Sequence, residues 1–343
     1  MRIWYDACTG KHVRYGVAVT KRLEEKGHEV IFTTRMHPDT IPLAKHLGVK
    51  FEVVGRYDPR TLYTRLYESL KRQIKFCRMF NEKKPDIAVS HQSVEQCRVA
   101  FGLGIPLIST HDTPHADAAN RLTLPLVDFL VVSKAISDEE LKTYPIKRIV
   151  KFDGVDEVAW IKGFRQTQRF DYGHPLIVVR QIETRASYAM GVEDITLKVA
   201  RKLVKYGRVI FLTRYVRKPV RDLIVPREFI DSASLAAEAD LVVSVGGTIS
   251  REAALQGTPS IVIPVLGRSE VNEYLCRKGF PIFFAKPEEI GNYVERLLGR
   301  KFDVKEKLSE LENPVDVIES LVREFSSEDV YGLKHQHRSQ PFN

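Results

Sequence analysis

Cysteine is scarce in this 343-residue chain, and long apolar runs are missing. The four cysteines, Cys8, Cys77, Cys97 and Cys276, are scattered, with no C-x-x-C pair and no metal-ligand spacing. This pattern predicts reduced thiols, most of them buried. No segment reaches the ~20 apolar residues that a membrane-spanning helix needs, and the N-terminal residues lack the basic and apolar regions of a secretion signal. We therefore expect a cytoplasmic protein.

The chain also lacks the glycine-rich motifs of the common nucleotide-binding folds. No G-x-x-x-x-G-K-[ST] occurs, and the first apolar segment leads into DACTGKH instead of G-x-G-x-x-G. No homeodomain, RNP, zinc-finger or KH signature is present, and positive charge is spread over both halves. We therefore expect no nucleic-acid partner, although the net charge of +9 favours an anionic ligand.

Short apolar runs alternate with helical patterns along most of the chain, without hairpin signals. This alternation predicts parallel sheets whose two faces are covered by helices. A polar break and the length of the chain indicate two domains. We expect a first domain over 1–150, a connection over 151–174, a second domain over 175–325 and a disordered tail over 326–343. Strands are expected near 2–8, 28–35, 51–55, 86–91, 106–112, 129–133, 175–181, 208–214, 241–247, 259–265 and 281–285.

A long helix is predicted over about 60–82, in the segment RTLYTRLYESLKRQIKFCRMFNEKK. Arg and Lys line one of its faces. Its apolar face carries Leu62, Leu66, Leu70, Ile74, Cys77 and Phe80. We favour an ordinary helix that packs this face on the core. The alternative is peripheral contact with a membrane of acidic lipid.

The segment SVGGTISREAALQGTPSIVIPV, residues 244–265, places a glycine pair between an apolar run and a short helical pattern. Gly246 and Gly247 would let a ligand approach the backbone closely, and the first N–H groups of the next helix favour phosphate. Thr248 and Ser250 add hydroxyls at the expected N-cap. The segment therefore predicts a phosphate-binding turn, with a plain strand–turn–helix as the alternative.

Glu252 and several arginines complete this expected site. Glu252 lies about one turn further along the helix, where a carboxylate suits the cis-diol of a ribose. Arg180 ends the first strand of the second domain and is the first choice for a diphosphate contact, with Arg185 and Arg214 behind it. Arg251, beside Glu252, joins the expected substrate-binding residues. Diphosphate and ribose together indicate a nucleotide, whereas surface solubility is the alternative role of each arginine.

Several segments resemble those of known families. GGTISREAALQGTP looks like the nucleotide-sugar loop of two-domain, B-type glycosyltransferases and is similar to that of bacterial UDP-N-acetylglucosamine 2-epimerases. KPDIAVSHQSVEQCRVAFGLGIPLIS and ANRLTLPLVDFLVVSKAISDEEL are similar to epimerase segments. Over roughly 1–325 the chain most resembles an uncharacterised, epimerase-like family known only as a domain of unknown function. The marks of that family here are D-x-C-T-x-K-H (Asp6 to His12), SHQSVE, HDTPHA, NRLTLP, FDG-V-D-E and GGT-x-x-REAALQGTP.

The resemblance implies two Rossmann-like parallel α/β domains facing across a cleft, the fold of B-type glycosyltransferases. It further implies that the second domain binds a nucleotide-diphosphate sugar, with a UDP-sugar first, and that no metal or other cofactor is needed. The carboxylates of the epimerases are not all matched. Gln92 and its neighbours follow the fourth strand where an Asp is expected, and Ala118, or a displaced Asp117, precedes the N-R pair.

Four residues of the first domain are the expected catalytic groups. His12 follows the first strand, where B-type transferases often place a base, and a neutral imidazole can take a proton from a hydroxyl. His111, Asp112 and His115 end the fifth strand and could form a histidine–carboxylate pair. A zinc site of His91, His111 and His115 is disfavoured, because no recognised ligand spacing joins them. An exposed helix residue is the alternative interpretation of His12.

These patterns together predict a nucleotide-sugar-dependent, glycosyltransferase-like enzyme that transfers a hexosyl group from a UDP-sugar. The alternatives are a UDP-sugar 2-epimerase-like isomerase or hydrolase, and a nucleotide-sugar-binding protein without catalysis.

Overall fold

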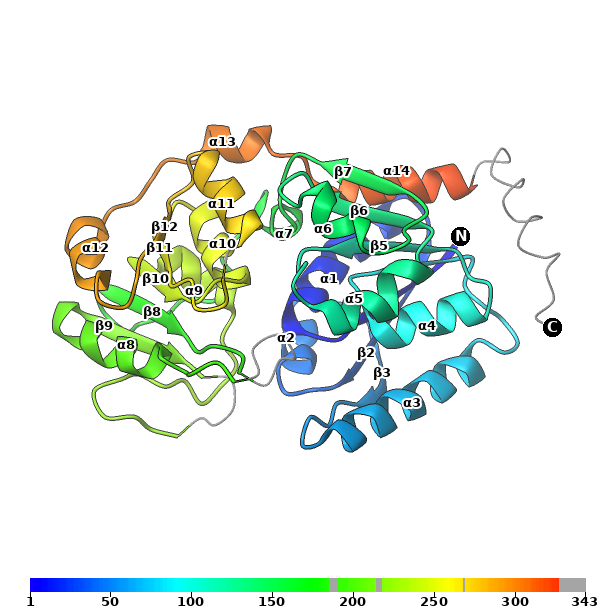
Figure 1. The fold of residues 1–343 in the computed structure, drawn as a ribbon, viewed down its shortest axis with the longest axis horizontal. Helices are drawn as coiled ribbons and strands as arrows, with labels where there is room; N and C mark the ends of the chain where they lie inside the picture. Colours follow the sequence, from blue (N-terminus) through cyan, green and yellow to red (C-terminus); the bar gives the residue numbers. More distant parts are fainter. Residues whose placement is uncertain (185–190, 214–217, 268, 327–343) are drawn as a thin grey trace. The chain divides into compact units, whose positions relative to one another are not determined.

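A computed structural model describes residues 1–184, 191–213, 218–267 and 269–326 (Figure 1). The chain divides into two compact units. The first contains residues 1–159 and the chain from Asn313 on, and the second is Trp160–Glu312. The last helix, α14 (Pro314–Ser326), contacts α1 and β6 of the first unit. The expected tail lies outside the described residues, except for Ser326.

Seven strands form the sheet of the first unit, in the order β3-β2-β1-β4-β5-β6-β7. All neighbouring pairs are parallel, and β1 lies between β2 and β4, with Ile3 opposite Val30 and Ile87. The strands are β1 (Arg2–Ala7), β2 (Glu29–Met36), β3 (Glu52–Arg56), β4 (Ile87–Ser90), β5 (Leu107–His111), β6 (Phe129–Ser133) and β7 (Ile149–Phe152).

Helices connect these strands, and side-chain caps define where two of them begin. The Thr9 hydroxyl accepts a hydrogen bond from the His12 backbone N–H at the start of α1, and Thr61 and Thr64 form a capping box at the start of α3. The helices are α1 (Gly10–Glu25), α2 (Thr40–His46), α3 (Leu62–Met79), α4 (Val94–Gly102), α5 (Asp117–Thr123), η1 (Leu124–Leu126), α6 (Asp138–Lys142) and, where the units divide, α7 (Val158–Ile161).

The second unit contains a five-stranded parallel sheet in the order β12-β11-β10-β8-β9. Its strands are β8 (Leu176–Arg180), β9 (Arg208–Leu212), β10 (Leu241–Ser244), β11 (Ser260–Val262) and β12 (Ile282–Phe284). Its helices are α8 (Thr196–Leu203), η3 (Val204–Tyr206), α9 (Ser232–Glu238), α10 (Thr248–Leu255), α11 (Glu270–Arg277), α12 (Ile290–Leu297) and α13 (Lys305–Glu310). Two parallel α/β sheets confirm the predicted fold class.

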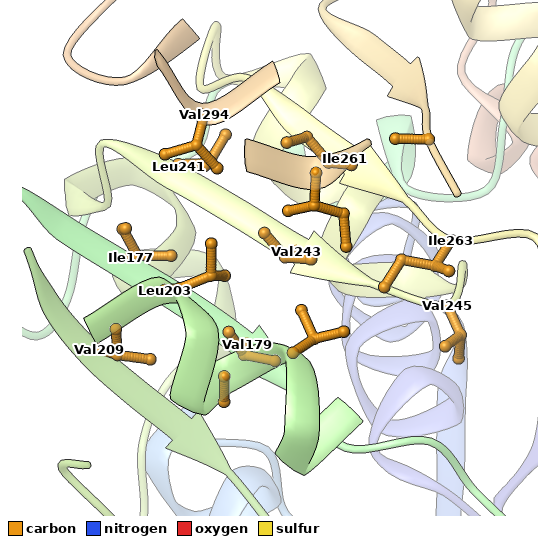
Figure 2. Close-up of a cluster of buried hydrophobic side chains, with 14 of the residues drawn as sticks. Ile177, Val179, Leu203, Val209, Leu241, Val243, Val245, Ile261, Ile263 and Val294 are labelled. Carbon is orange, nitrogen blue, oxygen red and sulfur yellow. The ribbon is translucent and has the colours of Figure 1, made fainter. Parts of the chain in front are cut away.

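The core of the second unit lies on both faces of its sheet, and Figure 2 shows one of the two. Ile177 and Val179 of β8 contribute to this cluster together with Val243 of β10, whereas Val178 and Val242 belong to the cluster on the opposite face. Successive strand residues point to opposite faces, so a strand covered on both sides must be apolar at every position. This explains the continuous runs LIVV and LVV.

Some predictions about single elements are wrong. Strand β7 overlaps the start of the expected connection, because an edge strand with only Phe152 buried lacks a marked apolar run. Helices α9 and α13 were not expected. Cys8 and Cys97 are buried free thiols, but Cys77 and Cys276 are exposed, so the expectation that most cysteines are buried is also wrong.

The face of helix α3 that packs on the core is opposite to the face that was predicted to do so. Phe80, just after the helix, is buried, but the other five residues of the predicted core face are exposed, from Leu62 to Cys77. Glu68, Arg72 and Phe76 are buried instead. Among the described residues, no helix combines the length and the hydropathy needed to cross a membrane.

Candidate functional site

The first group of candidate residues lies where β1 and β4 meet. The sheet order changes direction between these strands, and ligands of open parallel sheets bind beyond the strand ends at such a point. Helix α1 begins shortly after β1 and brings Lys11 and His12 to this edge, while His91 follows β4 and Asp112 follows β5. The segments that follow β1, β4 and β5, each with candidate residues, therefore meet at one edge of the first sheet.

The Lys11 ammonium group holds three carboxylates together at this edge. Its Nζ donates to Asp112 Oδ2 and, at 2.8 Å, to Asp156 Oδ2, and it lies 3.7 Å from Glu157 Oε1. The four side chains are no more than 13% exposed. Sequence reasoning missed Lys11, Asp156 and Glu157 as site residues, although they stand in the quoted motifs D-x-C-T-x-K-H and FDG-V-D-E.

Asp156 is the carboxyl group of this cluster whose protonation is shifted. Burial raises its pKa, Lys11 and His91 oppose that effect, and Asp112 raises the pKa further. A carboxyl group with a raised pKa exchanges its proton closer to neutral pH, which is the property that general acid–base catalysis requires.

His12 and His91 lie edge to face beside this cluster, with ring centres 4.8 Å apart. His12 Nδ1 accepts the Cys8 backbone N–H at 3.3 Å, which places the proton of the neutral ring on Nε2. Burial, together with the charges of His91, Arg35 and Lys11, lowers the pKa of His12 well below 6.5. The imidazole is therefore neutral at pH 7, and its unprotonated nitrogen, Nδ1, already accepts the Cys8 N–H.

His111 is oriented by a chain of amide hydrogen bonds. Asn120 donates through Nδ2 to the Pro114 carbonyl oxygen at 2.8 Å, so its Oδ1 accepts from Gln92 Nε2 at 2.9 Å. Gln92 Oε1 then accepts from His111 Nδ1 at 2.6 Å, which leaves Nε2 unprotonated and, among the described residues, without a hydrogen-bond partner. Burial lowers the pKa of His111 to about 4, so this ring is also neutral at pH 7.

Asp112 contacts a hydroxyl, an imidazole and an ammonium group at the end of β5. Its Oδ1 accepts from the Thr113 hydroxyl at 2.8 Å and lies 3.7 Å from His91 Nε2, while its Oδ2 bonds to Lys11. His115 is exposed on the loop before α5, where partial burial lowers its pKa and Asp112 raises it. The histidine–carboxylate pair among His111, Asp112 and His115 stays a prediction, as do the catalytic roles of these residues and of His12.

One group of residues in the described part of the chain has the composition of a metal site. Ligand atoms of His91, Asp112 and Asp156 all lie within 4.8 Å of one another. The Lys11 Nζ donates to both carboxylates of this group, so an ammonium ion stands where a metal cation would balance their charge. This set differs from the zinc site considered from the sequence, because it contains neither His111 nor His115.

The second group of candidate residues lies at the corresponding point of the second sheet. The strand order changes direction between β8 and β10, which are neighbours. Arg180 is the last residue of β8 and is half-buried, and Gly246 follows β10. Arg185 and Arg214, the two arginines expected behind Arg180, lie outside the described residues.

The glycine pair forms a turn that only glycine adopts readily. Gly246 and Gly247 have φ angles of 101° and 108°, in the left-handed region. A Cβ atom added to Gly247 would meet no heavy atom within 4 Å. Gly247 is itself the N-cap of α10, not Thr248 or Ser250 as expected, and no side chain caps the helix. The first N–H groups of α10 therefore keep their capacity to bind an anion.

Ser250 and Arg251 point into the protein. Ser250 Oγ lies 2.6 Å from Ser244 Oγ, and both hydroxyls are buried. Arg251 Nη1 donates to Asn272 Oδ1 at 3.3 Å. The Nδ2 of buried Asn272 has no hydrogen-bond partner in the described part of the chain, and a Cβ on Gly246 would lie 3.3 Å from it. Asn272 is thus a donor beside the glycine pair that sequence reasoning missed.

The Glu252 carboxylate is fully buried and already accepts hydrogen bonds from two other parts of the second unit. Oε1 accepts from Trp160 Nε1 and Oε2 from Ser232 Oγ, both at 2.9 Å. Neither partner was expected from the sequence, because Ser232 belongs to the unpredicted helix α9 and Trp160 to the expected connection. Binding of a ribose by Glu252 stays a prediction.

Comparison with known proteins gives the family and the fold. The pattern of a family described as protein of unknown function (DUF354) matches residues 1–327. The chain belongs to the DUF354 family. It is 32% identical over 333 residues to the uncharacterized protein MJ0665 of Methanocaldococcus jannaschii, and the match covers 92% of this chain and 96% of that relative. The resemblance to a domain-of-unknown-function family is confirmed.

Solved structures similar to this DUF354 chain include two kinds of enzyme. The UDP-GlcNAc 2-epimerase of Methanocaldococcus jannaschii has a TM-score of 0.64 and 14% identity, covering 94% of this chain and all of that one. A glycotransferase of kitacinnamycin has a TM-score of 0.62 and 13% identity, covering 94% and 98%. These likenesses show the fold, which is that of B-type glycosyltransferases with two Rossmann-like domains, as predicted.

Proposed function

We propose that this chain is a nucleotide-sugar-dependent enzyme that transfers a hexosyl group, with a UDP-sugar as the expected donor. The observation that carries the proposal is the turn at Gly246-Gly247, followed by the uncapped N-terminus of α10 at the switch point of the second sheet. This combination suits a diphosphate, because backbone N–H groups and the helix dipole both favour negative charge. The fold, shared with a UDP-GlcNAc 2-epimerase and a glycotransferase, supports the same class of ligand.

The second unit is proposed to bind the nucleotide part of the donor. Gly246, Gly247 and Thr248 would contact phosphate through the backbone, with Arg180 as the cation and the Asn272 amide as a further donor. Ser250 and Arg251 support this turn from below through their contacts with Ser244 and Asn272. Glu252 would bind the ribose, with the sugar hydroxyls sharing its carboxylate with Trp160 and Ser232.

The first unit is proposed to supply the acid–base groups of the transfer. The bond between sugar C1 and the diphosphate oxygen breaks, the acceptor oxygen forms a new bond to C1, and the acceptor proton passes to a base. Backbone donors aimed at the departing diphosphate stabilise the charge that it gains in the transition state. His12 is half-buried and neutral at pH 7, and it is the first candidate for the base, with Asp112 beside it. To take the acceptor proton, its Nδ1 would have to release the Cys8 N–H that it accepts in this structure.

Epimerisation at C2 of the sugar is the second candidate, and one observation favours it. Gln92 and Ala118 stand where epimerase carboxylates are expected, but Asp156 brings another carboxylate to the same edge through Lys11. Proton removal from carbon requires an acid and a base, and the shifted Asp156 with a neutral histidine could provide both.

An isotope experiment distinguishes the two reactions. UDP-sugars are incubated in deuterium oxide with and without a cell extract as the source of acceptor. Transfer predicts UDP release that depends on the extract and falls at least ~100-fold in His12→Ala, within the range that general-base catalysis contributes. His46→Ala, on α2, is the matched control and should keep full activity. Deuterium at C2 without extract would establish epimerisation instead, and no turnover under either condition would reject the enzymatic proposal.

A further inference from the structure

Helix α3 exposes an apolar ridge on the surface of the first unit. Leu62, Leu66 and Ile74 are 75%, 60% and 52% exposed, and Leu70 lies between them in the same row. Tyr63 and Tyr67 stand beside this row, with their rings stacked at 5.8 Å. Single exposed apolar residues are common, but a continuous row along three turns of one helix marks an interaction surface.

The core packing of α3 explains why this ridge faces outward. Arg72 is fully buried and donates to both oxygens of Asp6 on β1 and to the Val54 carbonyl oxygen on β3. Successive helix residues are separated by ~100°, so a residue two positions from Arg72, such as Leu70, points to nearly the opposite side. Rotation of the ridge into the core would pull Arg72 away from Asp6.

The charges beside the ridge have one sign. Lys71, Lys75 and Arg78 are exposed along one flank of the helix. The acidic residue of α3, Glu68, is buried and paired with Arg56 at 2.9 Å and with Lys71 at 3.8 Å, so the helix exposes no carboxylate. On the exposed surface of the helix the leucine ridge therefore lies next to a row of tyrosine and lysine, with Lys71 over the Tyr67 ring, and this is the composition of helices that lie in a membrane interface.

We propose that α3 docks on the surface of an anionic lipid bilayer, with the ridge in the headgroup region and Lys71, Lys75 and Arg78 over the lipid phosphates. This proposal is independent of the proposed function. A second copy of the chain fits the face less well, because pairing two α3 ridges would bring two basic flanks together without a carboxylate on either helix. Tyrosine at the edge of the ridge also suits the boundary between lipid and water.

Vesicle sedimentation of the full chain tests the proposal. The vesicles are phosphatidylcholine alone and phosphatidylcholine with phosphatidylglycerol, and the chain should sediment with the second kind only. Each basic residue near an anionic surface contributes roughly fivefold to partitioning, so the triple variant K71Q/K75Q/R78Q should lose about 100-fold. The variant L66S/L70S should lose binding as well, because it removes the apolar part of the contact.

A matched control removes the same charge elsewhere. Lys198, Arg201 and Lys202 are exposed on α8, and K198Q/R201Q/K202Q should keep full binding. Thermal unfolding should be unchanged in all three variants, since every altered side chain is exposed. An equal loss of vesicle binding in the α3 and α8 charge variants would overturn the proposal. It would show that binding depends on the net charge of the chain and not on α3. Absence of sedimentation with either kind of vesicle would also overturn the proposal. So would a dimeric mass of the chain in solution that L66S/L70S reduces to that of a monomer, because this result would assign the ridge to a second copy.

Discussion

Replacing Arg72 with leucine is expected to lower the free energy of unfolding by about 3–5 kcal/mol, the usual cost of leaving one partner of a buried ion pair alone. Arg72 and Asp6 are both fully buried, and the guanidinium donates to both carboxylate oxygens. Leucine fills part of the volume but leaves the Asp6 charge to neutral donors, among them the hydroxyls of Ser93 and Thr33 and the Cys8 thiol. Urea unfolding at pH 7 measures the loss.

Two comparisons make the Arg72 result specific. Arg121→Leu removes an exposed arginine paired with Asp117 and should leave the unfolding midpoint unchanged, because exposed ion pairs are screened by water. Burial raises the pKa of Asp6, but Arg72 and the hydrogen bonds from Ser93 and Thr33 lower it by more. The net result is a pKa below the usual 3.8. The stability from this pair is therefore present above pH 4 and is lost as the pH falls through the folded-state pKa. A deficit that does not shrink at acid pH would contradict this assignment.

Replacing Lys11 with methionine is expected to destabilise the protein by about 3 kcal/mol at pH 8 and to abolish the proposed activity. The variant leaves Asp112, Asp156 and Glu157 close together without the ammonium group that holds them. Their mutual repulsion would raise the pKa of Asp156 beyond the shift that burial already produces. Urea unfolding and the turnover assay with UDP-sugars measure the two effects.

The pH dependence separates this charge effect from a packing defect. A carboxyl group whose folded-state pKa is raised destabilises the fold increasingly as the pH rises from the unfolded-state pKa to the folded-state pKa. The deficit of Lys11→Met should therefore be smaller at pH 5 than at pH 8. Lys11→Arg keeps the charge and should recover part of the stability. A deficit of equal size at both pH values would show that Lys11 acts through packing alone.

The fold could be predicted from the sequence where strands are covered on both faces. Runs such as LIVV at 176–179 and FLVV at 129–132 are apolar at every position, because central parallel strands bury both faces. β7 at the sheet edge buries one side chain and was missed. α3 has an apolar stripe along its whole length, yet this stripe was assigned to the core, because the sequence does not show that the buried pair Arg72–Asp6 fixes the opposite face there. No periodic pattern in the helix reveals a partner 66 residues away.

The candidate site was predictable only where its residues are neighbours in the sequence. The glycine pair and its helix form one continuous segment, so their spacing was informative. Lys11 and Asp156 are 145 residues apart, and nothing in the sequence of either segment indicates that they meet. The same holds for Glu252, whose partners Trp160 and Ser232 are 92 and 20 residues away. The cytoplasmic location and the absence of a nucleic-acid partner stay predictions.

Thermal unfolding with a panel of nucleotides tests the central claim, that the second unit binds a nucleotide-diphosphate sugar. The panel contains UDP, GDP, TDP and CDP with their sugars, each far above the expected dissociation constant. A ligand at a hundredfold excess stabilises the folded state by about 2.7 kcal/mol, so the melting temperature should rise clearly with one nucleotide, UDP first. Arg180→Ala should abolish the rise, and Arg201→Ala, on the exposed side of α8, should keep it. No rise with any of the four nucleotides, or an equal rise in Arg180→Ala, would contradict the account.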